Sequence, residues 1–175
     1  LVLVNVTLDE VYDLTRYDEV SYLDHYQSGA ELQLTNAVSA SRADYVRDTK
    51  NYKGGGIKVG ILDGHITNTA GLPSSITVKP ENVYNYENCM HAKRVAKIIM
   101  TMAPNATYYA AWADNYITNI EWLLSQGVNV INISGELGAH YPNTITFATT
   151  WLDHVAFNHD VHLVLAAGNS GSAGV

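Results

Sequence analysis

The sequence has few charged residues, a single cysteine and no long apolar run. Charged residues make up 15% of the 175 residues, against about 25% in an ordinary soluble domain. Cys89 cannot by itself form an internal disulfide or a thiolate metal cluster. No apolar run approaches the roughly 18 residues that a membrane helix requires, so we predict no membrane span. The hydrophobic fraction of 47% excludes intrinsic disorder and predicts a globular domain with buried strands.

The balance of charge is acidic. Lys and Arg total 10 while Asp and Glu total 17, which gives a formal net charge of −7. We see no basic stripe that would offset this charge locally, so a nucleic-acid partner is excluded. The acidic residues form no run with the spacing of a calcium-binding loop. We therefore predict no cofactor and identify no metal site; calcium stays open as a ligand, without a site that the sequence identifies.

The two ends of the chain have the character of internal positions. The chain begins at Leu1 without a charged-then-apolar signal segment, and Gly174-Val175 comes shortly after a predicted buried strand. We interpret the chain as an excerpt of a longer protein, whose targeting sequence would lie outside it.

From residue 57 onward, short apolar runs alternate with helical patterns. Strands are predicted over residues 57–62, 107–112, 128–133 and 161–166, and helices over residues 91–102, 115–126 and 146–158. In the first of these helices Val95, Ile98, Ile99 and Met102 lie three and four residues apart, which indicates its apolar face. Gly127 follows the second helix, at a position where glycine adopts a left-handed cap at least cost.

This order of elements predicts the fold class. Strands that alternate with helices over short connections are parallel and are joined by right-handed crossovers. Near-continuous apolar strands indicate a sheet that is covered on both faces. We therefore predict an α/β fold with a doubly wound, mostly parallel sheet. The functional site of such a sheet lies beyond the carboxyl ends of the strands, where Asp63, residues 134–136 and Gly168-Asn169 are found.

The first 50 residues have a different pattern. Residues 7–17 predict a helix with Thr7 as a candidate cap, and residues 19–26 predict a strand. Residues 27–38 serve as a connector, and residues 39–49 predict a short helix before the sheet begins. We therefore expect a small α+β segment with its connector over residues 1–35 and the α/β domain over residues 36–175.

Three polar residues near these element ends match the parts of an acyl-transfer site. Asp63 ends the first strand in VGILDGHI, His91 opens the helix after a 27-residue loop, and Asn169 ends the fourth strand in LVLAAGNSG. A carboxylate fixes the tautomer of an imidazole and stabilises the imidazolium, while an amide donor stabilises an oxyanion. Each residue also has a structural interpretation, because Asp and Asn are common in caps and turns and a histidine can open a helix.

Five segments in order resemble the subtilisin-like serine proteases over roughly residues 50–175. GIKVGILDG resembles the aspartate strand of that family, HAKRVAKII its histidine helix, and APNATYYAA the strand that follows. GVNVINISGELG resembles the substrate-binding strand, and LVLAAGNSG the oxyanion-asparagine strand. The resemblance implies a subtilisin-like fold, incomplete in this chain, and a serine endopeptidase that hydrolyses peptide bonds.

Carried over residue by residue, the resemblance implies roles for individual positions. Asp63 and His91 match the triad aspartate and histidine, and Asn169 matches the oxyanion asparagine. Two further segments match those that line the specificity pocket and pair with an extended polypeptide substrate, namely Ser134, Gly135 and Glu136 together with Ala166, Ala167 and Gly168. Residues 8–26 resemble the end of an inhibitory propeptide, which in this family assists folding and occludes the cleft. Family habit also implies an extracellular or cell-envelope location.

The sequence departs from the family pattern in several places. Gly64-His65 follows the aspartate where the family has a glycine-rich turn, and Glu136 stands where a glycine is usual. The histidine helix continues AKRVAK in place of Gly-Thr-His-Val-Ala-Gly. No Gly-Thr-Ser-x-x-x-Pro nucleophile motif occurs. We therefore expect the nucleophile to lie in the missing C-terminal part of the catalytic domain, and the chain alone to be inactive.

Two other classes of function stay open. The altered histidine helix is compatible with a catalytically inactive scaffold that binds peptides along the same strands. Residues 168–174 follow a strand with the glycine density of a phosphate-binding loop, which keeps a nucleotide-binding domain as a third interpretation. Cys89 lies two residues before His91, and we interpret it as a structural thiol rather than a nucleophile.

Overall fold

The computed structural model of the chain describes residues 37–80, 90–134 and 145–167. The predicted helix and strand over residues 7–26, and the boundary between residues 35 and 36, lie outside these ranges. The described strands are β1 (Lys58–Asp63), β2 (Ile76–Val78), β3 (Thr107–Trp112), β4 (Val130–Ile133) and β5 (His162–Leu165). The helices are η1 (Tyr45–Thr49), α3 (Met90–Met102), α4 (Tyr116–Ser125) and α5 (Phe147–His159).

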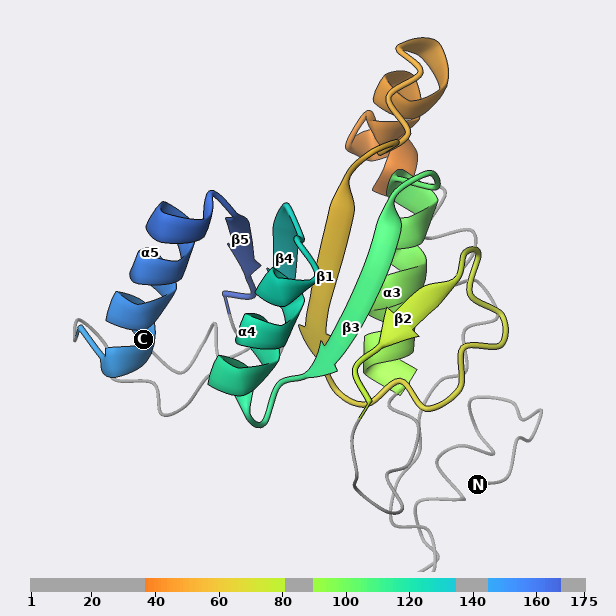
Figure 1. Ribbon diagram of the computed structural model, residues 1–175. Coiled ribbons are helices and arrows are strands. Elements are labelled where there is room, and N and C mark those ends of the chain that lie inside the picture. The colour runs from red at the N-terminus through yellow and green to blue at the C-terminus, as the bar shows by residue number, and fades with distance from the viewer. Residues whose placement is uncertain (1–36, 81–89, 135–144, 168–175) are drawn as a thin grey trace, which may run out of the picture.

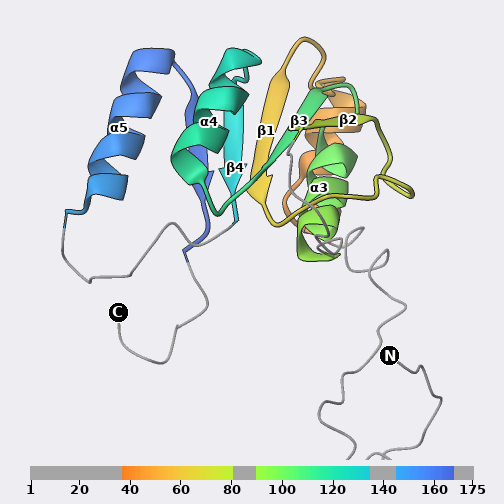
Figure 2. The ribbon, with the colours of Figure 1, turned by 60° about the horizontal axis from the view of Figure 1, so that its bottom comes forward.

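The five strands form one parallel sheet in the order β2-β3-β1-β4-β5. Helix α3 packs on one face of this sheet, and α4 and α5 pack on the other (Figure 1). Figure 2 shows the same arrangement from below, with α4 and α5 side by side. The predicted α/β class and the doubly wound parallel sheet are therefore confirmed.

Each face of the sheet has its own apolar core. The side chains under α3 include Val59, Ile61 and Tyr108, and those under α4 and α5 include Leu62 and Ile131. Neighbouring residues of β1 therefore alternate between the two cores, as the period of two in a strand requires. Both faces of β1 are covered, which explains its nearly uninterrupted apolar sequence.

Helix α4 packs closely on the sheet at Gly60, in the middle of β1. A β-carbon placed on Gly60 would lie 3.2 Å from a methyl carbon of Leu123 and 3.3 Å from Ile131. The glycine therefore lets the helix pack against the backbone of the strand. Gly127, which follows α4, has a φ of 71°, so the predicted left-handed conformation is confirmed.

Three expectations about local structure need correction. Residues 64–90 do not form only a loop, because they contain the edge strand β2, which is too short to show a periodicity. The short helix expected over residues 39–49 is a π-helix at Tyr45–Thr49, preceded by separate helical turns. Helix α3 buries Ala92, Ala96 and Met100 most completely. Of its predicted apolar face, Val95 and Ile99 are partly buried against the same core, whereas Ile98 is exposed. Small residues at that face bring the helix axis close to the sheet.

None of the helices in the part of the chain that the structure describes has the length and apolarity needed to cross a membrane.

Candidate active site

Asp63 is the last residue of β1, at the carboxyl end of the central strand. Its backbone carbonyl accepts a hydrogen bond from the amide of Ala113 at 2.8 Å, which ties this end of β1 to β3. The Asp63 residue is only 4% exposed. Burial of a carboxylate is costly unless donors satisfy it. The position of Asp63 therefore demands hydrogen-bond partners.

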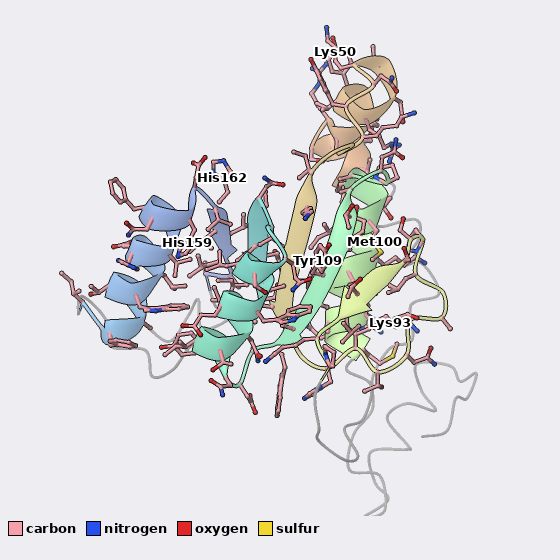
Figure 3. All side chains as sticks on the ribbon, in the orientation of Figure 1. Lys50, Lys93, Met100, Tyr109, His159 and His162 are labelled. Carbon is pink, nitrogen blue, oxygen red and sulfur yellow. The ribbon has the colours of Figure 1, made fainter. Side chains whose placement is uncertain are left out.

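His91 lies in the first turn of α3, which is anchored to the sheet by Ala92. The buried alanine fixes the start of the helix, while the His91 side chain itself is 64% exposed. Two of the basic residues by which this helix departs from the family motif do not enter the core. Arg94 is exposed, and Lys93 (labelled in Figure 3) is half-buried. This departure therefore leaves the helix–sheet packing intact.

The fold brings Asp63 and His91 into direct contact, although they are 28 positions apart in the chain. Asp63 Oδ1 lies 3.0 Å from Nδ1 of His91 and also accepts a hydrogen bond from the Gly64 amide at 2.6 Å. Because a carboxylate only accepts hydrogen bonds, Nδ1 of the ring carries the proton in this contact. The other ring nitrogen, Nε2, is then left as the basic atom on an exposed ring.

The second carboxylate oxygen of Asp63 has a different environment. Oδ2 is buried and has no hydrogen-bond partner among the residues that the structure describes. The two donors to Oδ1 therefore provide all the described hydrogen bonding of this carboxylate. A buried oxygen without a partner costs roughly 1–3 kcal/mol of stability.

Three of the predicted substrate-binding residues lie at the carboxyl ends of the strands, as Asp63 does. Ser134 follows β4, where its amide donates to the Leu62 carbonyl at 3.0 Å and its Oγ accepts from Asn132 at 2.7 Å. Ala166 follows β5 and donates to the Ile133 carbonyl at 3.0 Å, and both Ala166 and Ala167 are exposed. Four predicted site residues lie outside the described ranges: Gly135, Glu136, Gly168 and Asn169.

A further set of contacts beside Asp63 was not predicted from the sequence. The His65 ring packs on the Trp112 ring with 3.9 Å between centroids. The buried Asn119 of α4 donates from Nδ2 to the Trp112 carbonyl and accepts from Lys79 Nζ. His65, Lys79 and Trp112 also line a small hollow at the ends of β1, β2 and β3. The sequence signal that could have identified Asn119 is a polar residue on the apolar face of the helix predicted over residues 115–126.

No group of three or more His, Cys, Asp or Glu residues that could hold a metal ion occurs among the residues with a described structure. His159 and His162, labelled in Figure 3, lie at the end of α5 and the start of β5. Since the strands are parallel, these two residues lie at the amino ends of the strands, whereas Asp63 lies at the carboxyl ends.

Comparison with known proteins identifies the relatives of this chain. No protein-family model matches it. Subtilisin DY of Bacillus licheniformis is 32% identical over 155 residues, which cover 76% of this chain and 54% of that protein. The chain is a distant relative of the subtilisin-like serine proteases. The predicted resemblance is thereby confirmed as a distant relationship.

Two further relatives extend the similarity along the chain. Two relatives are each 27% identical to the chain over an alignment of 197 positions. They are subtilisin E of Bacillus subtilis (strain 168) and subtilisin NAT of Bacillus subtilis subsp. natto. Those matches cover 96% of this chain and 49% of each subtilisin. The chain thus spans about half the length of the curated subtilisins that it matches.

Proposed function

We propose that this chain is the amino-terminal part of a serine endopeptidase, in which Asp63 and His91 act as the orienting acid and the general base. The observation that carries this proposal is the 3.0 Å contact between Asp63 Oδ1 and His91 Nδ1. A buried carboxylate bound to one nitrogen of an exposed imidazole leaves the other nitrogen basic and accessible, as a serine-activating base requires. The relationship to subtilisins supports the same reaction class.

In the proposed mechanism His91 Nε2 removes the proton from a serine hydroxyl as its oxygen attacks the carbonyl carbon of a peptide bond. The imidazolium so formed keeps its Nδ1–H on Asp63, whose negative charge stabilises it. The amide of Asn169 donates to the oxyanion of the tetrahedral intermediate, an interaction worth about 2.7–4 kcal/mol when a donor of this kind is removed. His91 then gives its proton to the leaving amine nitrogen, and water hydrolyses the acyl-enzyme through the same base. The mechanism uses no cofactor.

The substrate in this proposal is an extended polypeptide. Ser134, Gly135 and Glu136 would pair with it on one side, and Ala166, Ala167 and Gly168 on the other, through main-chain hydrogen bonds. The position of Ser134 and Ala166 at the carboxyl edge of the sheet, where Asp63 lies, supports this arrangement. The relationship to subtilisins supports an extracellular or cell-envelope location.

Two more segments take part in the proposed enzyme. The nucleophilic serine would come from a part of the protein beyond Val175, and residues 8–26 would act as the end of an inhibitory propeptide. The exposure of Val164 (53%) and Leu165 (50%) on the edge strand β5 supports a covering segment there. Apolar side chains on an open edge strand favour pairing with further chain.

A serine-directed fluorophosphonate probe tests this function on the complete protein that contains the chain. We expect the complete protein to be labelled, and His91→Ala to abolish labelling because no base activates the serine. His162→Ala is the matched control, since this exposed histidine lies at the amino ends of the strands, away from Asp63 and His91. A complete protein that is folded by circular dichroism and remains unlabelled would contradict the proposal.

The alternative is a catalytically inactive scaffold that binds peptides along the same strands. It is favoured by the altered histidine helix, in which Lys93, Arg94 and Lys97 replace the threonine, histidine and second glycine of the family motif. This alternative predicts that the folded complete protein binds extended peptides, measured by fluorescence anisotropy, yet reacts with no phosphonate probe. A Gly-Thr-Ser motif in the sequence downstream of Val175 would contradict it.

A further inference from the structure

The turn that follows Asp63 controls the carboxylate that His91 contacts. The Gly64 amide donates to Asp63 Oδ1 at 2.6 Å, and the same oxygen meets His91 Nδ1. A glycine has the greatest backbone freedom of any residue, so Gly64 alone would leave this amide poorly oriented. The next residue, His65, is therefore in a position to limit the freedom of the turn.

Trp112 provides the surface on which His65 rests. Asp63 and Trp112 are register partners on the adjacent parallel strands β1 and β3, so their side chains lie on the same face of the sheet. The His65 and Trp112 rings are 3.9 Å apart between centroids, at an interplanar angle of 48°. The two rings are therefore in direct contact, and such contact restricts the orientation of the His65 ring.

Trp112 is itself held in place from the other side of the sheet. Its carbonyl accepts a hydrogen bond from Nδ2 of Asn119, which is 1% exposed in α4. The Asn119 amide is in turn bound by Lys79, which follows the edge strand β2. The backbone of Trp112, which carries the ring that His65 contacts, is thus tied through Asn119 to α4 and to the residue that follows β2.

We propose that His65 is a positioning residue that, through its ring contact with Trp112, holds the Asp63–Gly64 turn so that Oδ1 faces His91 Nδ1. This inference rests on the proposed protease function for its kinetic consequence, but not for its structural one. It gives a physical role to the residue that stands where the family has a glycine-rich turn. His65 acts through Asp63 and takes no part in proton transfer itself.

The test uses the complete protein labelled with ¹⁵N-histidine, with the Nδ1–H signal of His91 as readout. We expect His65→Gly to weaken this signal by faster solvent exchange, because the Asp63 carboxylate loses its fixed orientation. His65→Phe keeps an aromatic ring on Trp112 and is expected to preserve the signal. His162→Gly is the control. His162 lies at the amino ends of the strands, so we expect this change to leave the His91 signal unchanged.

Several outcomes would overturn the inference. An unchanged His91 signal in folded His65→Gly excludes a positioning role. Loss of the signal in His65→Phe with retention in His65→Asn would assign the effect to hydrogen bonding rather than to the ring contact. Should His65→Gly not fold, Trp112→Leu removes the same contact from the other side, and an unchanged signal there overturns the proposal equally.

Kinetics give a second, separate readout. In an active complete protein we expect His65→Gly to lower kcat by about 10-fold or more with little change in KM, since small misplacements of catalytic groups act on the reaction step. An unchanged kcat with an altered KM would contradict this expectation. If the complete protein has no protease activity, the proposed function fails, while the histidine signal still decides the role of His65.

Discussion

Asp63 and Asn119 are the two polar side chains that the described part of the chain buries. Their surroundings differ in one respect that matters for function. Both side-chain atoms of the Asn119 amide are hydrogen-bonded, to Trp112 and Lys79, whereas Asp63 leaves Oδ2 without a described partner. Asn119 therefore has the satisfied pattern of a structural residue, and Asp63 has the pattern expected where a site is arranged for chemistry.

Asn119→Leu should destabilise the folded protein. The change leaves the Trp112 carbonyl and the Lys79 ammonium without their partner, and a lost buried partner costs about 1–3 kcal/mol. The free energy of unfolding from urea titration measures this loss. Asn115→Ala is the matched control, because Asn115 is exposed and makes no side-chain cap hydrogen bond, so its effect should stay within about 0.5 kcal/mol. Equal losses in both variants would contradict the structural role of Asn119.

Tyr108 should make stability sensitive to alkaline pH. Burial raises the pKa of the Tyr108 phenol above its ordinary value, and the hydroxyl donates to the Ala103 carbonyl. Above about pH 10 the unfolded chain loses this proton while the folded chain keeps it. The unfolded state then binds fewer protons, so the free energy of unfolding falls as the pH rises.

Comparing Tyr108→Phe with the unaltered protein between pH 9 and roughly pH 11 tests this sign, since tyrosine ionises near pH 10. The stability advantage of the unaltered protein over Tyr108→Phe should shrink as the pH increases. Tyr52→Phe is the control, because Tyr52 is 73% exposed and its stability difference should stay constant. An advantage that stays constant for Tyr108 as well would rule out this linkage.

At the scale of elements, the site depends on how closely the helices approach β1. Ala92 and Ala96 seat α3 on one face, and Gly60 admits α4 on the other. Small residues at these contacts determine the position of β1 between the helices, and therefore the position of Asp63 at its end. A change at Gly60 should thus affect packing along the whole strand.

Gly60→Ala should destabilise the protein by about 1–3 kcal/mol, the usual cost of an added methyl group in a packed core. The new β-carbon would lie 3.2–3.3 Å from carbons of Leu123 and Ile131, which belong to two different elements. Gly55→Ala is the matched control, since nothing lies within 4 Å of a β-carbon there. Thermal denaturation of both variants measures the difference, and a fully stable Gly60→Ala would mean that α4 can shift freely.

At the scale of the whole molecule, the end of β1 and the first turn of α3 provide the proposed acid and base, and the proposal places the serine outside the described residues. The relationship to subtilisins, of which the chain spans about half, supports an enzyme completed by further chain. Under the same proposal, the propeptide-like segment of residues 1–35 would inhibit the finished enzyme by pairing with the strands that bind the substrate.

A synthetic peptide of residues 1–35 should therefore inhibit the active complete protein. Inhibition is expected to be competitive with a peptide substrate, because both would use the same strand edges. A peptide of identical composition and shuffled order is the control, and it separates specific binding from the effect of the peptide's acidic charge. Inhibition by both peptides, or by neither, would contradict the propeptide assignment.

Most of the fold could be predicted from the sequence because the predicted elements from β1 onward are long enough to show a period. The period of 3.6 in residues 115–126 and the continuous apolar run in residues 57–62 each identify an element. Strand β2 was missed, since three residues show no period. The buried face of α3 was predicted only in part, because large apolar residues suggest burial more strongly than the alanines that the close packing selects.

The sequence by itself determined the alternation of strands and helices, and it placed Asp63 at a strand end and His91 at a helix start. It did so because backbone periodicity and turn residues are local properties. Only the tertiary structure decided that Asp63 Oδ1 meets His91 Nδ1, that His65 rests on Trp112 and that Asn119 links Lys79 to β3. Each of these contacts joins side chains from different elements, whose distance is set by parallel strand pairing and helix packing rather than by spacing along the chain.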